Sequence, residues 1–436
     1  MLYCIVIMAK KFQGVSSVFR RGNRQQDDRE FLVGLDIGTE YVKALIGEVR
    51  SDTVNIIGVG RAHQQLADMQ AGAISDIAAV VQNCDNALAQ AEKQAEISAR
   101  SAVVGIAGEL VKGKTVTVRC RRNQPDTSLT MEEMSQIIQM VQERAADRAR
   151  RELSVDLGGK EIEIRLVNSA LVSIEIDGYP VTNPLGFQGK DVVVQLYTAF
   201  APLIHIGAIE KVAQELDLDL LAVAAEPFAV ARSVIGNDPN QNKNAIIMDV
   251  GGGTTDIAVI QEGGLQGTEI FSIGGRAFTR AIEREQNIDF VDAEKKKLSL
   301  SEPSTSDKDK QVVAKALNRT LDVWESGVEL ALSEFSQLDH LPENILLCGG
   351  GASLPPLFDR LKQADWSDEL AFTKAPRVQH IAPEDVVLIS DKTGAVDDHT
   401  YVTAMGLLRV GLDTLQQQEG LSSGTIKQKI DRMLRI

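Results

Sequence analysis

Two stretches of the chain repeat one pattern of apolar and polar positions. The first runs from Leu32 into Asp36-Ile-Gly-Thr and continues as a second apolar run from Val42. The other runs from Ala245 into Asp249-Val-Gly-Gly-Gly-Thr, and a second apolar run follows it too. An apolar run, a turn of Gly and Thr, and another apolar run predict a β-hairpin. The repeat therefore predicts two related halves, each with one Asp-containing turn.

The first half combines strand and helix patterns. Three apolar runs lie between residues 31 and 61, and a helix from 206 to 216 and the run 220–232 appear later. Between them, six apolar positions have helical spacing: Ile77, Val80, Val81, Cys84, Leu88 and Ala91. Residues 31–99 and 201–236 are therefore predicted to form one α/β lobe.

Residues 100–200 are predicted to form an inserted α+β module that interrupts this lobe. A helix is indicated from Met131 to Leu153, and Thr130 and Glu133 have the spacing of a capping box at its start. Strands are indicated at 102–106, 115–118, 170–176 and 192–200.

The second half is predicted to form another lobe over residues 244–412, after a polar linker at 236–244. A helix is expected after Gly274-Gly275, and the strand 344–348 runs into a third glycine cluster. A long helix is indicated by an apolar stripe at Val313, Leu317, Leu321, Trp324, Val328 and Leu332.

Both ends of the chain differ from these lobes. Residues 1–30 are interpreted as a flexible basic arm, and 413–424 as a polar linker. Residues 425–436 place four apolar side chains on one helical stripe with basic residues beside it, which favours a short amphipathic helix on an anionic membrane. A frayed tail or a helix docked on the protein itself are the alternatives. The stripe consists of Ile426, Ile430, Met433 and Leu434.

Composition narrows the class of protein. A length of 436 residues favours two large lobes, and a net charge of −15 argues against a nucleic-acid binder. The four cysteines are scattered without metal-binding spacing, which favours a reduced cytoplasmic protein. No run approaches the ~20 apolar residues of a membrane span. The opening apolar octapeptide lacks signal-peptide features, and Met8 is an alternative start to Met1.

The two Asp-containing turns are candidates for binding a phosphate tail and a hydrated Mg²⁺. The paired carboxylates of Asp36 and Asp249 would hold the ion through water, and backbone amides would meet phosphate oxygens. The first turn taken alone also fits a plain hairpin, whereas three consecutive glycines after a strand favour close approach of a phosphate. The phosphate-binding candidates are Gly38, Thr39, Gly251, Gly252, Gly253 and Thr254.

Further residues fit the same scheme. Glu226 could orient a water for attack on the γ-phosphate, although a Glu before Pro is also common at a helix start. With Asp249 it is the candidate catalytic pair, and slow phosphoryl transfer or simple ATP binding both stay open. Glu294 and Lys297 could meet the ribose and the adenine, with a solvated charge run as the alternative. The remaining nucleotide candidates are Gly274, Gly275, Gly349, Gly350, Gly351 and Ser353.

These motifs resemble the actin/Hsp70/hexokinase superfamily, an α/β, two-lobed actin-like ATP-binding fold. With an insert that looks like the SHS2-type subdomain, the chain is similar to the bacterial FtsA cell-division family from about 31 to 412. In that family's terms, 31–99 with 201–236 is subdomain 1A, 100–200 is 1C, and 244–412 is 2A with 2B at about 275–345.

The resemblance implies a peripheral membrane protein that binds ATP and Mg²⁺ and polymerises like actin. It would tether FtsZ filaments of the Z ring to the cytoplasmic face of the cell membrane at the division site, and recruit later divisome proteins. The FtsZ tail would dock on residues 275–345.

Three other classes share parts of this pattern. A PilM-type scaffold of type IV pilus assembly has the same fold and insert, but the terminal amphipathic stripe argues against it. An Hsp70-like chaperone would need a β-rich substrate domain after the lobes. A sugar or glycerol kinase would need an acceptor-activating base, and none stands out.

Overall fold

The described part of the chain is organised around two β-sheets. The structure is a computed structural model that describes residues 30–235, 243–363 and 365–423. The linker predicted at 236–244 falls largely outside these ranges, as do the basic arm up to residue 29 and the whole predicted membrane helix. None of the helices in the described ranges combines the length and the apolar composition needed to cross a bilayer.

The smaller sheet contains the first predicted hairpin. Its six strands are, in spatial order, β11 (Asp219–Ala225), β6 (Ser101–Ile106), β1 (Glu30–Ile37), β2 (Tyr41–Arg50), β3 (Thr53–His63) and β17 (Ile389–Asp391). β1 and β2 form the predicted hairpin, and β1, β6 and β11 run parallel. The three strand runs predicted between 31 and 61 are confirmed.

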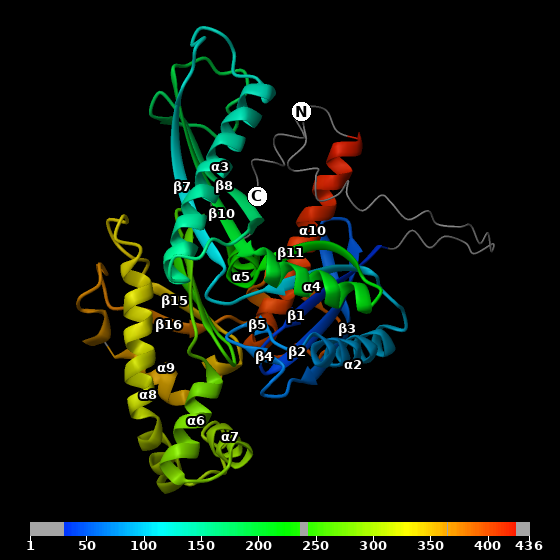
Figure 1. The fold of residues 1–436 in the computed structure, drawn as a ribbon, viewed down its shortest axis with the longest axis vertical. Helices are drawn as coiled ribbons and strands as arrows, with labels where there is room; N and C mark the ends of the chain where they lie inside the picture. The colour runs from blue at the N-terminus through cyan, green and yellow to red at the C-terminus, as the bar shows by residue number, and fades with distance from the viewer. Residues whose placement is uncertain (1–29, 236–242, 364, 424–436) are drawn as a thin grey trace, which may run out of the picture. The chain divides into compact units, whose positions relative to one another are not determined.

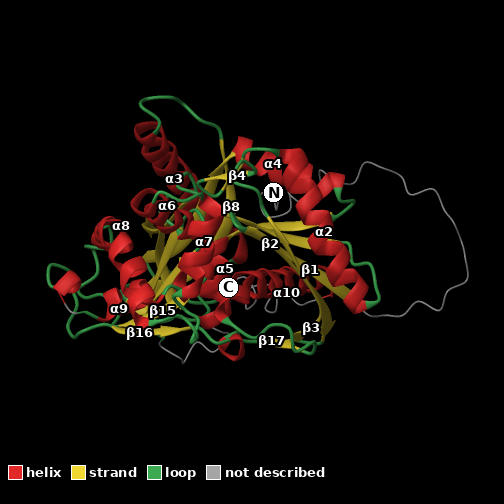
Figure 2. Cartoon of the chain, turned by 90° about the horizontal axis from the view of Figure 1, so that it is seen from below, coloured by secondary structure: helices red, strands yellow, loops and turns green. Residues whose placement is uncertain are grey.

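Helices pack closely on both faces of this sheet. Figure 2 shows its strands between α2 (Ile77–Ala95) and α10 (Val402–Ser423). A Cβ atom at Gly60 would lie 1.8 Å from the backbone oxygen of Ala87 in α2. One at Gly34 would lie 2.8 Å from the backbone oxygen of Ala404 in α10. The strand glycines therefore allow both helix backbones to approach the sheet.

The larger sheet joins the second hairpin to the inserted strands. Its nine strands are, in spatial order, β16 (Arg377–His380), β15 (Asn344–Cys348), β12 (Ala245–Val250), β13 (Thr255–Gln261), β14 (Gly264–Phe271), β7 (Lys112–Arg121), β10 (Asp191–Pro202), β8 (Ile164–Ile176) and β9 (Tyr179–Pro180). The junction between β14 and β7 consists of the pairs Gly267–Lys114 and Thr268–Gly113. The insert thus extends the sheet of the second hairpin.

Helix α3 (Met131–Asp156) covers one face of the inserted strands (Figure 1). The predicted start at Met131 is confirmed, and the helix continues beyond the predicted end at Leu153. The predicted capping box is formed only in part. Thr130 Oγ1 accepts a hydrogen bond from the Glu133 backbone N–H at 3.3 Å, as expected. The Glu133 carboxylate instead pairs with Arg122 at 2.7 Å, because this buried guanidinium is the stronger partner.

Three predicted boundaries are wrong. The predicted insert includes residues 101–106, yet they form the β6 strand of the six-stranded sheet. Residues 389–412 were assigned to the second lobe, but β17 pairs with β3, and α10 packs on the smaller sheet through Leu407 and Leu408. The linker predicted at 413–424 is helical up to Ser423, since Asp413 pairs with Arg232 and extends the ordered packing.

Three helices follow the second hairpin, namely α6 (Gly275–Gln286), α7 (Phe290–Ser299) and α8 (Asp307–Ser333). All six residues of the predicted apolar stripe on α8 are buried. Trp324 is fully buried, and its indole Nε1 donates to Thr255 Oγ1 at 2.9 Å. Thr255 in turn donates to the Ile273 carbonyl at 2.7 Å. The buried face of α8 therefore supports the second glycine turn.

The stripe on α8 yields a stability prediction. Leu321→Ala should lower the free energy of unfolding by roughly 2–5 kcal/mol, since it leaves a cavity at a site that is 2% exposed. Val323→Ala on the same helix, at a site that is 54% exposed, should change it by less than about 0.5 kcal/mol. Urea titration followed by circular dichroism measures both, and equal losses would contradict the assigned helix face.

Candidate functional site

The two Asp-containing turns are in direct contact. A Cβ atom at Gly253 would lie 2.7 Å from Thr39 Oγ1, and one at Gly252 would lie 2.9 Å from Glu40 Cβ. Both turns follow buried strands, so the strands β1 and β12 deliver them to one place. The structure therefore brings together the predicted residues Gly38, Thr39, Gly251, Gly252, Gly253 and Thr254.

Arg276 ties these two turns to each other. Its backbone N–H donates to the Gly252 carbonyl at 2.8 Å. Its guanidinium Nε donates to Glu40 Oε2 at 2.7 Å, and the other guanidinium nitrogens reach the carbonyls of Gln65 and Leu66. The opposite carboxylate oxygen of Glu40 lies 2.9 Å from His63 Nε2. One side chain thus spans residues 236 positions apart in the sequence.

The third glycine turn packs against the second. Gly349 has a φ of +80°, and a Cβ atom there would lie 2.1 Å from Asp249 Oδ1. Both the backbone conformation and the close approach therefore require glycine. A Cβ atom at Gly351 would lie 3.0 Å from the Gly251 carbonyl oxygen, whereas one at Gly350 would meet nothing within 4 Å.

Helices α6 and α7 add further contacts to the second glycine turn. The backbone N–H of Gly275 donates to the Gly251 carbonyl at 2.8 Å, and a Cβ atom at Gly274 would lie 2.7 Å from the same oxygen. Lys297 Nζ donates to the Gly275 carbonyl at 3.0 Å and pairs with Glu294 at 2.8 Å. The side chains of Lys297 and Glu294 are 12% and 22% exposed, so a solvated charge run does not describe them.

Four carboxyl groups are buried around the first two turns. They belong to Asp36, Glu226, Asp249 and Asp256, which are 3–9% exposed. Lys43 Nζ donates to Asp36 Oδ2 at 2.9 Å, and Thr403 Oγ1 donates to Asp249 Oδ2 at 2.5 Å. Asp256 Oδ1 has no hydrogen-bond partner among the described residues. The site therefore holds more buried carboxyl groups than buried basic groups.

The cluster shifts the acid–base properties of its members. Burial, followed by the charges of Asp36, Asp256 and Asp249, raises the pKa of Glu226 well above its ordinary value. Burial and then the Asp249 charge do the same to the pKa of Asp256. Burial would lower the pKa of Lys43, but Asp36 and Asp249 outweigh it, and the pKa of Lys43 rises. Binding a cation here would relieve the repulsion between the carboxylates.

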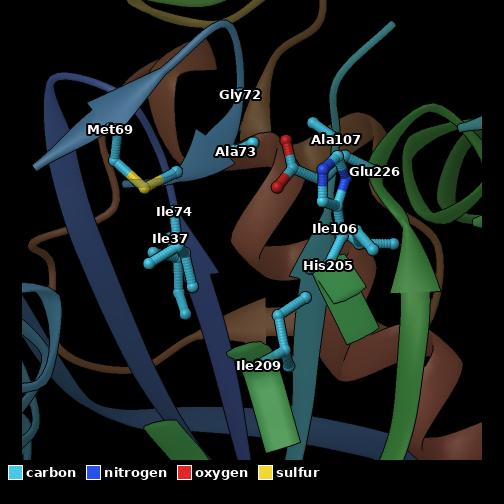
Figure 3. A pocket seen from close by; sticks show the side chains of 11 residues that line it. Ile37, Met69, Gly72, Ala73, Ile74, Ile106, Ala107, His205, Ile209 and Glu226 are labelled. Atoms are coloured by element: carbon cyan, nitrogen blue, oxygen red, sulfur yellow. The ribbon is translucent and has the colours of Figure 1, made fainter. Parts of the chain in front are cut away.

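Glu226 is the first residue of α5 (Glu226–Ile235), and it also faces a small pocket (Figure 3). Gly105 on β6 leaves room for it, because a Cβ atom there would lie 2.7 Å from Glu226 Oε1. His205 of α4 (Leu203–Glu215) lines the same pocket, and burial lowers the pKa of its ring. The rest of the lining is mostly apolar. The interpretation of Glu226 as a helix start is therefore confirmed, and its catalytic role stays a prediction.

Several residues of the site were not predicted. Asp256 ends the second glycine motif and lies opposite Asp249 in the hairpin. Its spacing from Asp249 along the sequence was the signal that could have identified it. Lys43 lies in β2, and the apolar pattern of this strand does not indicate that the Lys43 side chain points toward the site. Thr403 and Arg276 reach the site from 154 and 236 residues away, and no local pattern marks them. In the described part of the chain, no three His, Cys, Asp or Glu side chains are arranged to bind a metal directly.

Comparison with known proteins gives two kinds of similarity. The sequence model of the family described as "Cell division protein FtsA" matches residues 246–406. The cell division protein FtsA of Bacillus subtilis is 23% identical over 404 residues, covering 88% of this chain and 84% of the relative. That of Pseudomonas aeruginosa is 26% identical over 420 residues, covering 90% of this chain and 91% of the relative.

A solved structure with a similar fold is the PilM–PilN type IV pilus biogenesis complex. Its matching chain has a TM-score of 0.62 and 17% sequence identity, covering 87% of this chain and 98% of its own length. At this identity the similarity concerns the fold alone. The chain thus resembles the FtsA cell-division proteins in sequence over most of its length, and its fold is actin-like.

Proposed function

We propose that the protein binds ATP with Mg²⁺ at the junction of the three glycine turns. The observation that carries this proposal is the contact between turns from distant parts of the sequence, beside a cluster of buried carboxylates. Gly38, Thr39 and Gly251–Gly253 would meet the β- and γ-phosphates. Gly349–Gly351 with Ser353 and the Gly274–Gly275 turn would meet the rest of the nucleotide, and Glu294 and Lys297 the ribose and adenine side.

The carboxylate cluster fits a divalent cation. Asp36 and Asp249 would hold hydrated Mg²⁺, which screens phosphate charge when bound. Support comes from the unpartnered Oδ1 of Asp256 and from the raised pKa of Asp249, which burial causes first and the Asp36 charge increases. Glu226 would orient a water toward the γ-phosphate. Its raised pKa makes the ionised carboxylate a stronger base, and a bound cation would favour that ionised form. Any hydrolysis would then depend on Glu226 and Asp249.

For the cellular role we propose an FtsA-type assembly protein. The full-length relatives named cell division protein FtsA support this. The protein would polymerise with itself and tether FtsZ filaments to the cytoplasmic face of the membrane at the division site, where later divisome proteins join. Helices α6–α8 would receive FtsZ, an SHS2-type insert would serve filament contacts, and residues 425–436 would bind anionic lipid.

A PilM-type pilus scaffold is the second candidate. The fold similarity to the PilM–PilN complex favours it. The two candidates differ in partners: FtsZ and an anionic membrane for the first, a membrane-protein peptide for the second. The terminal stripe at Ile426, Ile430, Met433 and Leu434 supports the first.

The nucleotide site can be tested with Gly251→Val. A Cβ atom at Gly251 meets nothing closer than 3.4 Å, so the fold should accept the change while the added methyl groups exclude the phosphates. Mg-ATP at a hundredfold its Kd should stabilise the unchanged protein by ~2.7 kcal/mol and leave the variant unaffected. Differential scanning fluorimetry measures both. Gly207→Val on the surface of α4 is the control, and ATP stabilisation of a folded Gly251→Val protein refutes the site.

The Arg276–Glu40 pair predicts coupling between the turns. Arg276→Met and Glu40→Gln should each speed release of a fluorescent ATP analogue about two- to tenfold, and the double variant should add little. Stopped-flow chase experiments give the rates. Arg280→Met, which breaks a pair with Glu283 within α6, should leave release unchanged. If the effects of Arg276→Met and Glu40→Gln on the release rate are additive, the two residues act independently and the predicted coupling is refuted.

Membrane attachment can be tested by deleting residues 425–436. The full chain should sediment with phosphatidylglycerol vesicles and, with Mg-ATP, carry FtsZ into the pellet. The truncated chain should stay in the supernatant and still bind ATP. Undiminished sedimentation would move the anchor to residues 1–30, and failure of both proteins to sediment would favour the pilus scaffold.

A further inference from the structure

Three aromatic rings stack beneath the third glycine turn. They are Phe358 of α9 (Pro355–Lys362), His380 of β16 and His399 of η4 (His399–Tyr401). The ring centroids of Phe358 and His380 are 4.8 Å apart, and those of His380 and His399 are 4.2 Å apart. The planes are inclined by 13° and 20°, so the rings stack face to face. Three separate elements therefore form one rigid support.

Both histidines bond to the same short segment, η1 (Gly350–Ser353), which completes the third turn. His380 Nε2 lies 3.0 Å from the Ala352 carbonyl oxygen, which can only accept, so this nitrogen carries the proton. His399 Nε2 lies 3.0 Å from Ser353 Oγ. The backbone of His399 also accepts the Gly349 N–H at 3.3 Å. The turn is therefore held at its first residue and at its last two.

Ser353 also connects the turn to α7. Its carbonyl oxygen accepts a hydrogen bond from Ser301 Oγ at 3.1 Å, just beyond the helix that carries Glu294 and Lys297. Displacing Ser353 would therefore disturb two of the segments assigned to the nucleotide. Gly349–Gly351 supply little rigidity themselves, because glycine has the greatest backbone freedom. The position of the turn must come from outside it.

The surroundings of His399, burial above all, favour its neutral form. Burial, and then the neighbouring His380, lowers the pKa of His399 to about 4, while Asp398 opposes this. The far face of Phe358 carries Lys362, whose Nζ lies 4.3 Å from the ring centroid. A neutral ring can exchange donor and acceptor roles with Ser353, so their bond persists at neutral pH.

We propose that His399 is a positioning residue for the nucleotide: through Ser353 it holds the third glycine turn in its binding conformation, with His380 as its support. The inference rests on the proposed ATP site and adds residues that contact no phosphate or metal themselves. Affinity would come from a turn that is ordered before the ligand arrives, which removes an entropic penalty from binding.

The test measures the affinity of the full chain for fluorescent ATP with Mg²⁺ in a set of variants. His399→Ala should weaken binding about five- to tenfold, while His399→Gln, which keeps a polar group near Nε2, should recover most of it. Ser353→Ala should weaken binding similarly, and the His399→Ala/Ser353→Ala double variant should be no weaker than either. Exposed His340→Ala is the control and should bind normally.

Melting temperatures without nucleotide separate positioning from general stability. We expect His399→Ala and His399→Gln to melt together but to differ in affinity. Normal binding by His399→Ala, or additive losses in the double variant, overturns the positioning role while leaving the ATP site standing. If the unchanged chain fails to bind ATP, the proposed function falls and this inference falls with it. If His399→Ala does not fold, the comparison of His399→Gln with Ser353→Ala decides.

Discussion

The structure depends on how the repulsion between several carboxyl groups, buried close together, is offset. Asp36, Glu226, Asp249 and Asp256 come from three strands and a helix start, and their mutual repulsion disfavours the folded state unless it is offset. The fold offsets this repulsion with Lys43 and with the Thr403 hydroxyl, and the pKa values of Glu226, Asp249 and Asp256 are raised as a consequence of burial and repulsion. Burying these carboxyl groups together does not stabilise the fold. Their presence at the junction is therefore the reason to regard it as a binding site.

Glycine allows this junction to be compact. Each of the three turns touches another at distances that a Cβ atom would forbid, so the site is a single contact unit built from remote segments. Side chains then connect the backbones: Arg276 joins the first two turns, Thr403 reaches Asp249, and His399 holds the third turn. The two sheets are thus joined at the place where the chemistry is proposed to occur.

The sequence predicts local structure well, but it does not show which distant segments of the chain contact one another. Apolar runs on both sides of Gly/Thr turns predicted both hairpins, and helical spacing predicted the buried face of α8, because each pattern depends on neighbours within a few residues. Periodicity cannot say which sheet a strand joins, so β6 and α10 were assigned to the wrong unit. The same holds for side chains: glycine runs marked the turns, while the Arg276 and Thr403 contacts depend on folding across more than 150 residues.

Helix α10 connects the candidate site to the last residues that the structure describes. Its first turn bonds to Asp249 through Thr403, and its last described residue, Ser423, precedes by two positions the segment proposed to bind lipid. A helix of 22 residues is about 33 Å long, and packing against α5 and the smaller sheet keeps it stiff. A displacement of Asp249 would therefore act at one end of this helix, whose other end is Ser423, two positions before the segment proposed to bind lipid.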